Sequence, residues 1–139
     1  MKTLPQDPIQ QMGIKQFGIH LRRGEISSEA VTRQYLERIA ALNPKLAAYV
    51  HVATEAAVET ARGIDRLVKG GTDLGPLMGV PVAVKDIFTV AGMPTRAGSK
   101  MDISDLVAAE GSFIRSVKRQ GCVILGKTRT IEFAAGAQN

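Results

Sequence analysis

The 139-residue sequence has little of what several classes of protein require. Its single cysteine, Cys122, allows no internal disulfide, which fits a reducing compartment such as the cytoplasm. It has no tryptophan, two tyrosines and four phenylalanines, too few for the aromatic surface on which single-stranded nucleic acid stacks. No apolar run approaches the roughly 18 residues of a membrane span, and the first residues, MKTLPQDPIQQ, lack the apolar stretch of a secretory signal. We therefore expect a soluble globular chain.

The sequence also has no dense block of one charge. Its formal net charge is +5 and its pI is near 9.7, values that would suit a protein that binds nucleic acid. However, the 18 lysines and arginines are spread along the chain, as expected for the solvated faces of helices. We expect neither a nucleic-acid partner nor a membrane partner.

The first half of the chain carries the periodic pattern of amphipathic helices. Helices are predicted at residues 7–23, 27–43 and 54–70, with a short strand at 48–52. Each helix has a capping residue at its start and a glycine or proline at its end. The predicted caps are Asp7, Ser27 and Thr54, and the predicted ends are Gly24, Pro44 and Gly70. Residues 1–70, approximately, are expected to form a helical layer.

The second half of the chain predicts strands alternating with helices. Residues 80–84 and 122–125 are predicted to be buried strands, and Phe113, Ile114 and Val117 are expected on one face of a helix that ends at Gly121. Between them, residues 100–109 are predicted to form a loop with a short helical turn. This alternation indicates an α/β fold whose core begins near residue 74 and continues to residue 139.

A strand that ends in a charge is the most informative feature. The run Val80-Pro81-Val82-Ala83-Val84 is apolar at every position and stops at Lys85-Asp86. Because side chains alternate along a strand, both faces of this strand are apolar, and we expect both to be buried. Pro81 has no backbone donor and belongs at the first residue or at a sheet edge. A lysine at the end of such a strand is unusual.

The residues after Lys85 form a loop of small residues. The segments AGMPT and AGS follow GVPVAVKD, and their glycines let the backbone approach a ligand or another segment closely. Together these residues resemble the N-terminal half of the signature of the amidase-signature hydrolases. The phrase LNPKLAAYV at residues 42–50 and the segment VILGKT with Glu132-Phe133-Ala134 are similar to other blocks of that family.

The resemblance implies a fold and a chemistry. It implies helices packed on the first strands of a mixed β-sheet, and hydrolysis of carboxamides by a Ser–cis-Ser–Lys triad without metal or cofactor. Lys85 matches the family's catalytic lysine, which accepts a proton as a neutral amine. We expect burial at the end of an apolar strand to favour that neutral state. Asp86 is expected on the opposite face, where it hydrogen bonds loop amides, and Ser99 is expected to do the same.

One motif points to a different function. Residues 121–128, GCVILGKT, match the phosphate-binding pattern G-x-x-x-x-G-K-[ST]. In a true phosphate-binding loop the strand precedes the first glycine, whereas here the four intervening residues are themselves the predicted strand. Alternating strand amides cannot wrap a phosphate, so nucleotide binding is not expected. The same residues VILGKT belong to the block that resembles the amidase-signature family, which usually has asparagine where this chain has Arg129.

Two further interpretations of the resemblance stay open. The family's serine pair lies in a Gly/Ser-rich block beyond the Glu-Phe-Ala segment, so we expect these 139 residues alone to hydrolyse no amide. The family's domain also has further strands, so we expect these residues alone to leave an apolar face or edge of the sheet exposed. The chain could instead be a non-catalytic structural or interaction fragment of an amidase, or a glutaminase that feeds a tRNA amidotransferase, a branch that usually carries asparagine where Ile87 stands. Beyond a small amide substrate, self-association or a complementing C-terminal segment is the expected partner.

Overall fold

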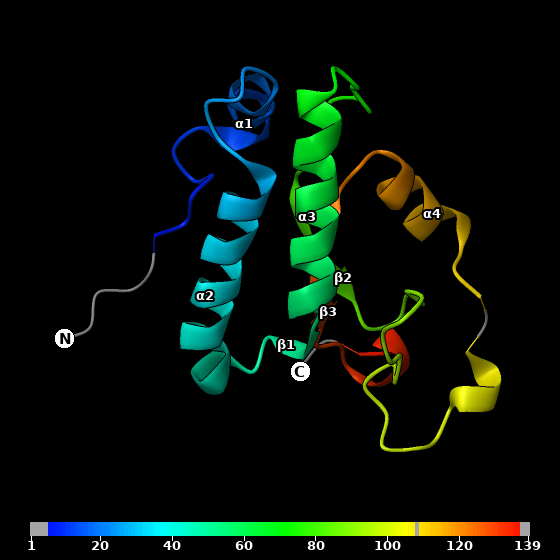
Figure 1. The fold of residues 1–139 in the computed structure, drawn as a ribbon. Helices are drawn as coiled ribbons and strands as arrows, with labels where there is room; N and C mark the ends of the chain where they lie inside the picture. Colours follow the sequence, from blue (N-terminus) through cyan, green and yellow to red (C-terminus); the bar gives the residue numbers. More distant parts are fainter. Residues whose placement is uncertain (1–5, 108, 137–139) are drawn as a thin grey trace.

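A small mixed sheet covered by helices makes up the fold (Figure 1). The computed structural model describes residues 6–107 and 109–136. The elements run in the order α1 Gly13–Arg22, α2 Ser28–Leu46, β1 Tyr49–Val52, α3 Thr54–Lys69, β2 Pro81–Lys85, α4 Ser112–Arg119 and β3 Val123–Thr128, with short 3-10 turns at Ser104–Leu106 and Glu132–Ala134. This arrangement confirms the α/β class expected from the sequence.

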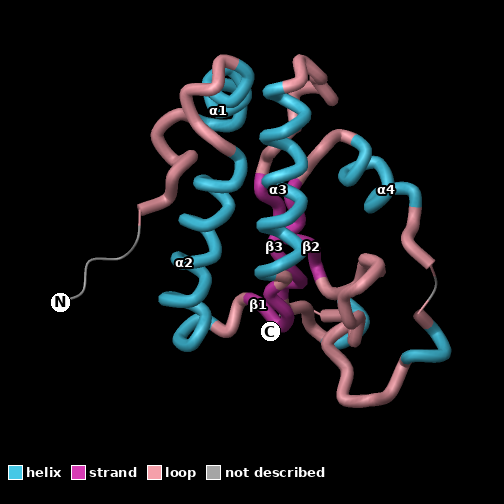
Figure 2. The backbone as a smooth tube through the Cα atoms, viewed as in Figure 1, coloured by secondary structure: helices cyan, strands magenta, loops and turns pink. Residues whose placement is uncertain are grey.

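The sheet has the strand order β1-β3-β2. The central strand β3 pairs antiparallel with β1 and parallel with β2, so the sheet is mixed, as expected. Helices α2 and α3 lie side by side, and α3 packs on β3, which Figure 2 shows behind it. Helix α4 lies on the other side of α3 from α2 (Figure 1). Among the described residues β2 pairs with β3 alone and is an edge strand, and Pro81 is its first residue, as predicted.

Helix α1 begins later than the sequence predicted. Asp7 does accept hydrogen bonds from the backbone of Ile9 and Gln10, but it closes an isolated turn rather than the helix. Gly13, the first residue of α1, has φ of +69°, a left-handed conformation that breaks the continuity between this turn and the helix. The predicted end is confirmed, because Gly24 also has φ of +69°.

Helix α2 confirms its predicted start but not its predicted end. The Ser27 side chain accepts a hydrogen bond from Ala30 N, as an N-cap should. Pro44 does not stop the helix, which continues to Leu46 and ends at Ala47 in the left-handed conformation. A proline in the last turn removes only one hydrogen bond, and the Asn43 side chain ties this turn to the backbone of Tyr49.

The remaining elements agree with prediction to within a few residues. Helix α3 begins at Thr54 with Ala53 as its N-cap, so Thr54 does not cap it, and Gly70 is its C-cap as predicted. The short helical turn predicted within the loop at residues 100–109 is present as the 3-10 turn Ser104–Leu106, and Ala108 lies outside the described residues. In α4, Ile114 is buried, but Phe113 is exposed and contacts Phe88 instead. No helix in the described part of the chain is long and apolar enough to span a membrane.

The core forms where α2 and α3 meet the sheet. One cluster joins these helices to β3, and a second joins α1 to the segment leading into β2. The buried members of these two clusters are Ile9, Phe17, Leu21, Val31, Leu36, Ala57, Val58, Ala61, Ile64, Met78, Val80, Val123 and Leu125. Cys122 is buried as a free thiol, as expected of a small core residue, and burial raises the pKa of that thiol.

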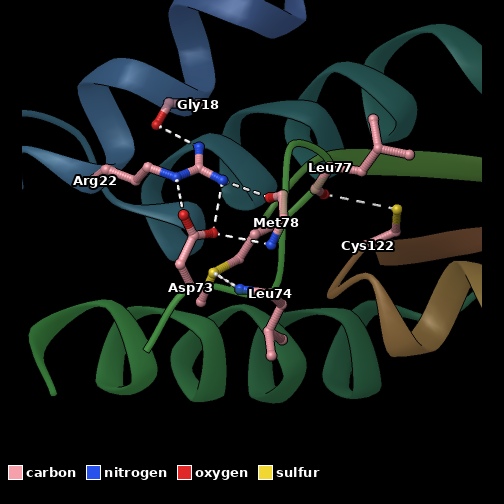
Figure 3. Close-up of polar contacts among 8 residues, drawn as sticks. Gly18, Arg22, Asp73, Leu74, Leu77, Met78 and Cys122 are labelled. Atoms are coloured by element: carbon pink, nitrogen blue, oxygen red, sulfur yellow. Dashed lines mark hydrogen bonds and ion pairs between the residues drawn. The ribbon is translucent and has the colours of Figure 1, made fainter. Parts of the chain in front are cut away.

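An ion pair fastens α1 to the connection between α3 and β2 (Figure 3). The Arg22 guanidinium donates two hydrogen bonds of 2.8 Å to the Asp73 carboxylate, and others to the carbonyls of Gly18 and Gly75. Asp73 also accepts a hydrogen bond from Gly75 N. These contacts hold the segment that leads the chain into β2.

The burial of both faces that the apolar pattern of β2 predicts is not reached in the described residues, which leave one face open, in agreement with the expectation for these residues alone. Val84 is buried against Val90, Ile114 and Ile124, but Ala83 is exposed on the other face. The reason is that no described helix or loop covers that second face. Apolar strand residues therefore remain accessible at the edge of the sheet.

Candidate active site

The candidate site lies where β2 and β3 end together. The two strands are parallel, and Lys85 at the end of β2 pairs in register with Thr128 at the end of β3. In α/β sheets, ligands bind outside the carboxyl ends of parallel strands. Lys85 thus occupies a position suited to chemistry on geometric grounds, independently of any family.

The side chain of Lys85 is exposed, which corrects the expected burial. It lies on the same open face of β2 as Ala83. The described residues thus do not supply the apolar surroundings that would favour a neutral amine. Any such surroundings in a working site must come from residues other than those described.

Asp86 points to the opposite side from Lys85 and is buried, as alternation along the strand predicts. One of its carboxylate oxygens, Oδ2, accepts a hydrogen bond of 3.2 Å from Arg96 N in the following loop. Its backbone carbonyl accepts a second from Ala97 N, at 3.0 Å. The expectation that Asp86 binds loop amides agrees with this geometry.

The other carboxylate oxygen of Asp86 receives a buried lysine. Lys127 Nζ lies 2.8 Å from Asp86 Oδ1, and the two side chains are 0% and 4% exposed. The same ammonium donates to Pro94 O at 3.2 Å and to Thr95 Oγ1 at 2.8 Å. The sequence placed Lys127 in the false phosphate motif and in the family block VILGKT, and neither revealed this partner. A lysine directly after an apolar strand run was the available signal.

The structure also excludes the phosphate-binding interpretation of residues 121–128. Strand β3 extends from Val123 through Thr128, so even the Gly-Lys-Thr of the motif is strand. The ammonium of Lys127 is fully buried and engaged with Asp86, so it faces no solvent-accessible phosphate site. A side chain on Gly126 would overlap His51 of the paired strand, which explains that glycine without a ligand.

The loop after β2 folds back tightly on the chain after β3. Ala97 and Gly98 both have positive φ, 50° and 72°, and Phe133 N donates to Ala97 O at 2.7 Å. A Cβ on Gly98 would lie 2.5 Å from Thr130 O, so only glycine permits this approach. The small residues after Lys85 thus serve contact between two segments of the chain.

Ser99 fixes the end of this loop. Its Oγ donates to Glu132 at 2.7 Å and accepts a hydrogen bond from Met101 N at 3.1 Å. Ser99 therefore binds a loop amide, as expected, and also holds the Glu-Phe-Ala segment. Two sequence blocks that are 33 residues apart along the chain meet at this point.

A hollow of about 220 Å³ adjoins the buried pair. Asp86, Arg96 and Arg129 contribute to its lining, together with His51 of β1. Arg129, which stands where the family usually has asparagine, donates from Nε to Ala47 O at 2.8 Å and so ties β3 to the end of α2. In the described part of the chain, no group of three or more His, Cys, Asp or Glu side chains could hold a metal ion.

Known proteins resemble this chain in both sequence and fold. The family model described as Amidase matches residues 30–139. A glutamyl-tRNA(Gln) amidotransferase subunit of Acidothermus cellulolyticus is 43% identical over 113 residues, which cover 81% of this chain and 22% of that protein. The same subunit of Salinispora tropica is 44% identical over 115 residues, 83% of this chain and 23% of that protein.

Solved structures of amidases share the fold of this chain. The native peptide amidase of Stenotrophomonas maltophilia superposes with a TM-score of 0.84 at 32% identity, over 94% of this chain and 27% of that one. An amidase family protein of Bacillus anthracis superposes with a TM-score of 0.77 at 27% identity, over 89% and 25%. The chain thus spans about a quarter of the length of these proteins, and it matches the N-terminal part of the amidase fold. It belongs to the amidase-signature family.

Proposed function

We propose that the chain is the N-terminal part of a hydrolase that cleaves carboxamide C–N bonds, with Lys85 as the proton acceptor of a Ser–cis-Ser–Lys triad. The observation that carries the proposal is the position of Lys85, exposed at the joint carboxyl end of two parallel strands and flanked by motifs of the family. An amide is a poor electrophile, so the reaction needs an activated nucleophile as well as a proton acceptor. The serine pair of the triad belongs to the part of the family's domain beyond these residues.

The exposed face of β2 supports this division of labour. In the proposed enzyme, the later part of the domain covers Ala83 and Lys85, removes water from the lysine and brings the serines to it. Without that part, a proton acceptor can give general-base assistance of about 10²–10⁴-fold, far from the 10⁶-fold or more of an enzyme. The 139 residues alone are accordingly proposed to be inactive and to self-associate through their open face and edge.

The test is a substitution of Lys85 in a completed amidase domain, meaning these residues joined in one polypeptide to the remainder of such a domain. Lys85→Ala should abolish ammonia release from a panel of simple carboxamides. The fold should survive, because an exposed side chain is removed. Lys69→Met, a change at an exposed lysine at the end of α3, is the matched control and should retain turnover. Near-normal turnover by Lys85→Ala would exclude the assignment.

A second candidate is a glutaminase that supplies ammonia to a tRNA amidotransferase. The observation in its favour is the identity of 43% and 44% to two curated glutamyl-tRNA(Gln) amidotransferase subunits. Ile87 stands against it, because that branch usually carries asparagine there. The two candidates share the role of Lys85 and differ in substrate, so glutamine in the carboxamide panel separates them. Hydrolysis of glutamine in strong preference to other amides would favour the glutaminase.

A further inference from the structure

The buried ammonium of Lys127 is satisfied at every donor position. A lysine ammonium has three N–H donors, and Lys127 places them on Asp86 Oδ1, Pro94 O and Thr95 Oγ1. The side chain is 0% exposed, so water replaces none of these partners. A buried charge with this complete set of partners has a defined geometry.

Stability alone does not account for such a pair. Replacing a buried ion pair by apolar side chains of similar volume is often neutral or stabilising, because both charges must be desolvated. Apolar side chains could not replace the directional hydrogen bonds that this pair makes. Lys127 of β3 binds Asp86, the first residue after β2, and two residues of the following loop. Asp86 in turn accepts a hydrogen bond from Arg96 N. The pair therefore locks three segments in one arrangement.

The Lys127–Asp86 pair is connected to the orientation of Lys85 through the backbone at the end of β2. Asp86 N donates to Thr128 O at 3.0 Å, so the strand geometry continues through Lys85 to Asp86. Since neighbouring side chains on a strand project to opposite faces, holding Asp86 on the buried side holds Lys85 on the open side. We propose that Lys127 is a positioning residue for amide hydrolysis, which acts through Asp86 to orient Lys85. This inference rests on the proposed role of Lys85.

The competing explanation is that the pair only stabilises the fold, and a paired substitution separates the two. Lys127→Met alone leaves a buried carboxylate without its partner and is expected to destabilise the chain severely. The double variant Asp86→Leu/Lys127→Met removes both charges and should regain most of the urea midpoint. It still lacks the hydrogen bonds to Pro94, Thr95 and Arg96 that orient the end of β2.

The experiment measures kcat, KM and the urea midpoint of the double variant in the completed amidase domain, with a panel of simple carboxamides. We expect a folded protein whose kcat falls by about 10²-fold, the cost of a misplaced catalytic group, while KM changes little. Lys69→Met should leave kcat, KM and the midpoint unchanged. A double variant with a wild-type kcat would overturn the inference and leave the pair a structural role only.

A second readout needs no turnover. Acetic anhydride labelling of the same folded proteins, mapped by mass spectrometry, reports the surroundings of Lys85. We expect the double variant to change the labelling rate of Lys85 severalfold and that of Lys69 not at all, whereas equal Lys85 rates would contradict the inference. If Lys85→Ala retains turnover, both the proposed function and the inference about Lys127 fail. If Lys85→Ala is inactive but the double variant is fully active, only the inference about Lys127 fails.

Discussion

Strand β2 is held at its two ends by ion pairs that differ in burial. Before the strand, Arg22 at the end of α1 and Asp73 in the connection from α3 to β2 are 32% and 56% exposed. After it, Lys127 and Asp86 are 0% and 4% exposed and lie under the candidate site. Both pairs join segments far apart in the sequence, 51 and 41 residues respectively.

The difference teaches at which pair the loss of a single partner is costly. An exposed ion pair contributes little to the free energy of unfolding, because water already solvates both charges well and salt screens their attraction. In a buried pair, loss of one partner leaves a charge without solvent or counterion. We infer that the first end of β2 tolerates the loss of one charged partner and that the second does not.

The largest expected effect is a loss of stability when the lysine of the buried ion pair is replaced. Lys127→Met should lower the free energy of unfolding by about 3–5 kcal/mol, since Asp86 is left buried and unpaired. Against a total of about 5–15 kcal/mol for a typical domain, that change can unfold the chain. Arg22→Met, the matched change at the exposed pair, should cost far less. Urea denaturation followed by circular dichroism measures both, and equal losses would contradict the comparison.

A smaller effect is expected from glycines of similar conformation at the two ends. Gly71, near Asp73, has φ of +78° with nothing within 4 Å of an added Cβ. Gly98, in the loop held by Lys127, has φ of +72°, and its added Cβ would lie 2.5 Å from Thr130 O. Gly71→Ala should cost roughly 1–2 kcal/mol for left-handed backbone alone. Gly98→Ala should cost a further 1–3 kcal/mol, roughly, for the clash.

Thermal and urea unfolding of the two alanine variants measure this difference. Because both alanines face the same backbone penalty, the excess at Gly98 reports how closely its loop packs on the chain after β3. Equal destabilisation by both would show that the loop at the candidate site yields as easily as the exposed connection.

The sequence predicted those parts of the fold that depend on local chemistry. The Ser27 cap, the stop at Gly70 and the strand start at Pro81 follow from the hydrogen-bonding and backbone preferences of single residues. Alternation along β2 likewise placed Lys85 and Asp86 on opposite sides. The alternation of predicted strands and helices indicated the α/β class, and the structure confirms it.

The failures of prediction depend on contacts with distant residues. Pro44 did not end α2 because Asn43 and Tyr49 hold the last turn together. Two apolar faces predicted a strand covered twice, but burial requires a covering element that no pattern within the strand reveals. The partner of Lys127 is 41 residues away, so the spacing of residues within its own motif could not identify it.

The smallest expected effect is the pH dependence of the exposed pair. The hydrogen bonds from the Arg22 guanidinium, and then from Gly75 N, lower the pKa of the Asp73 carboxyl from 3.8 to about 2. A carboxyl with a lowered pKa stabilises the folded state above its unfolded pKa and loses that contribution as pH falls through the folded value. Wild type should therefore be slightly more stable than Asp73→Asn at neutral pH, with the gap closing between about pH 4 and pH 2.

Urea midpoints of both proteins across that pH range measure the gap. The control repeats the substitution in an Arg22→Met background, where the main cause of the lowered pKa is absent and the pH-dependent gap should shrink. A gap of unchanged size in that background would show that Gly75 N, rather than Arg22, holds the carboxylate. In that case the first end of β2 would depend on a backbone hydrogen bond, and its ion pair would contribute nothing measurable.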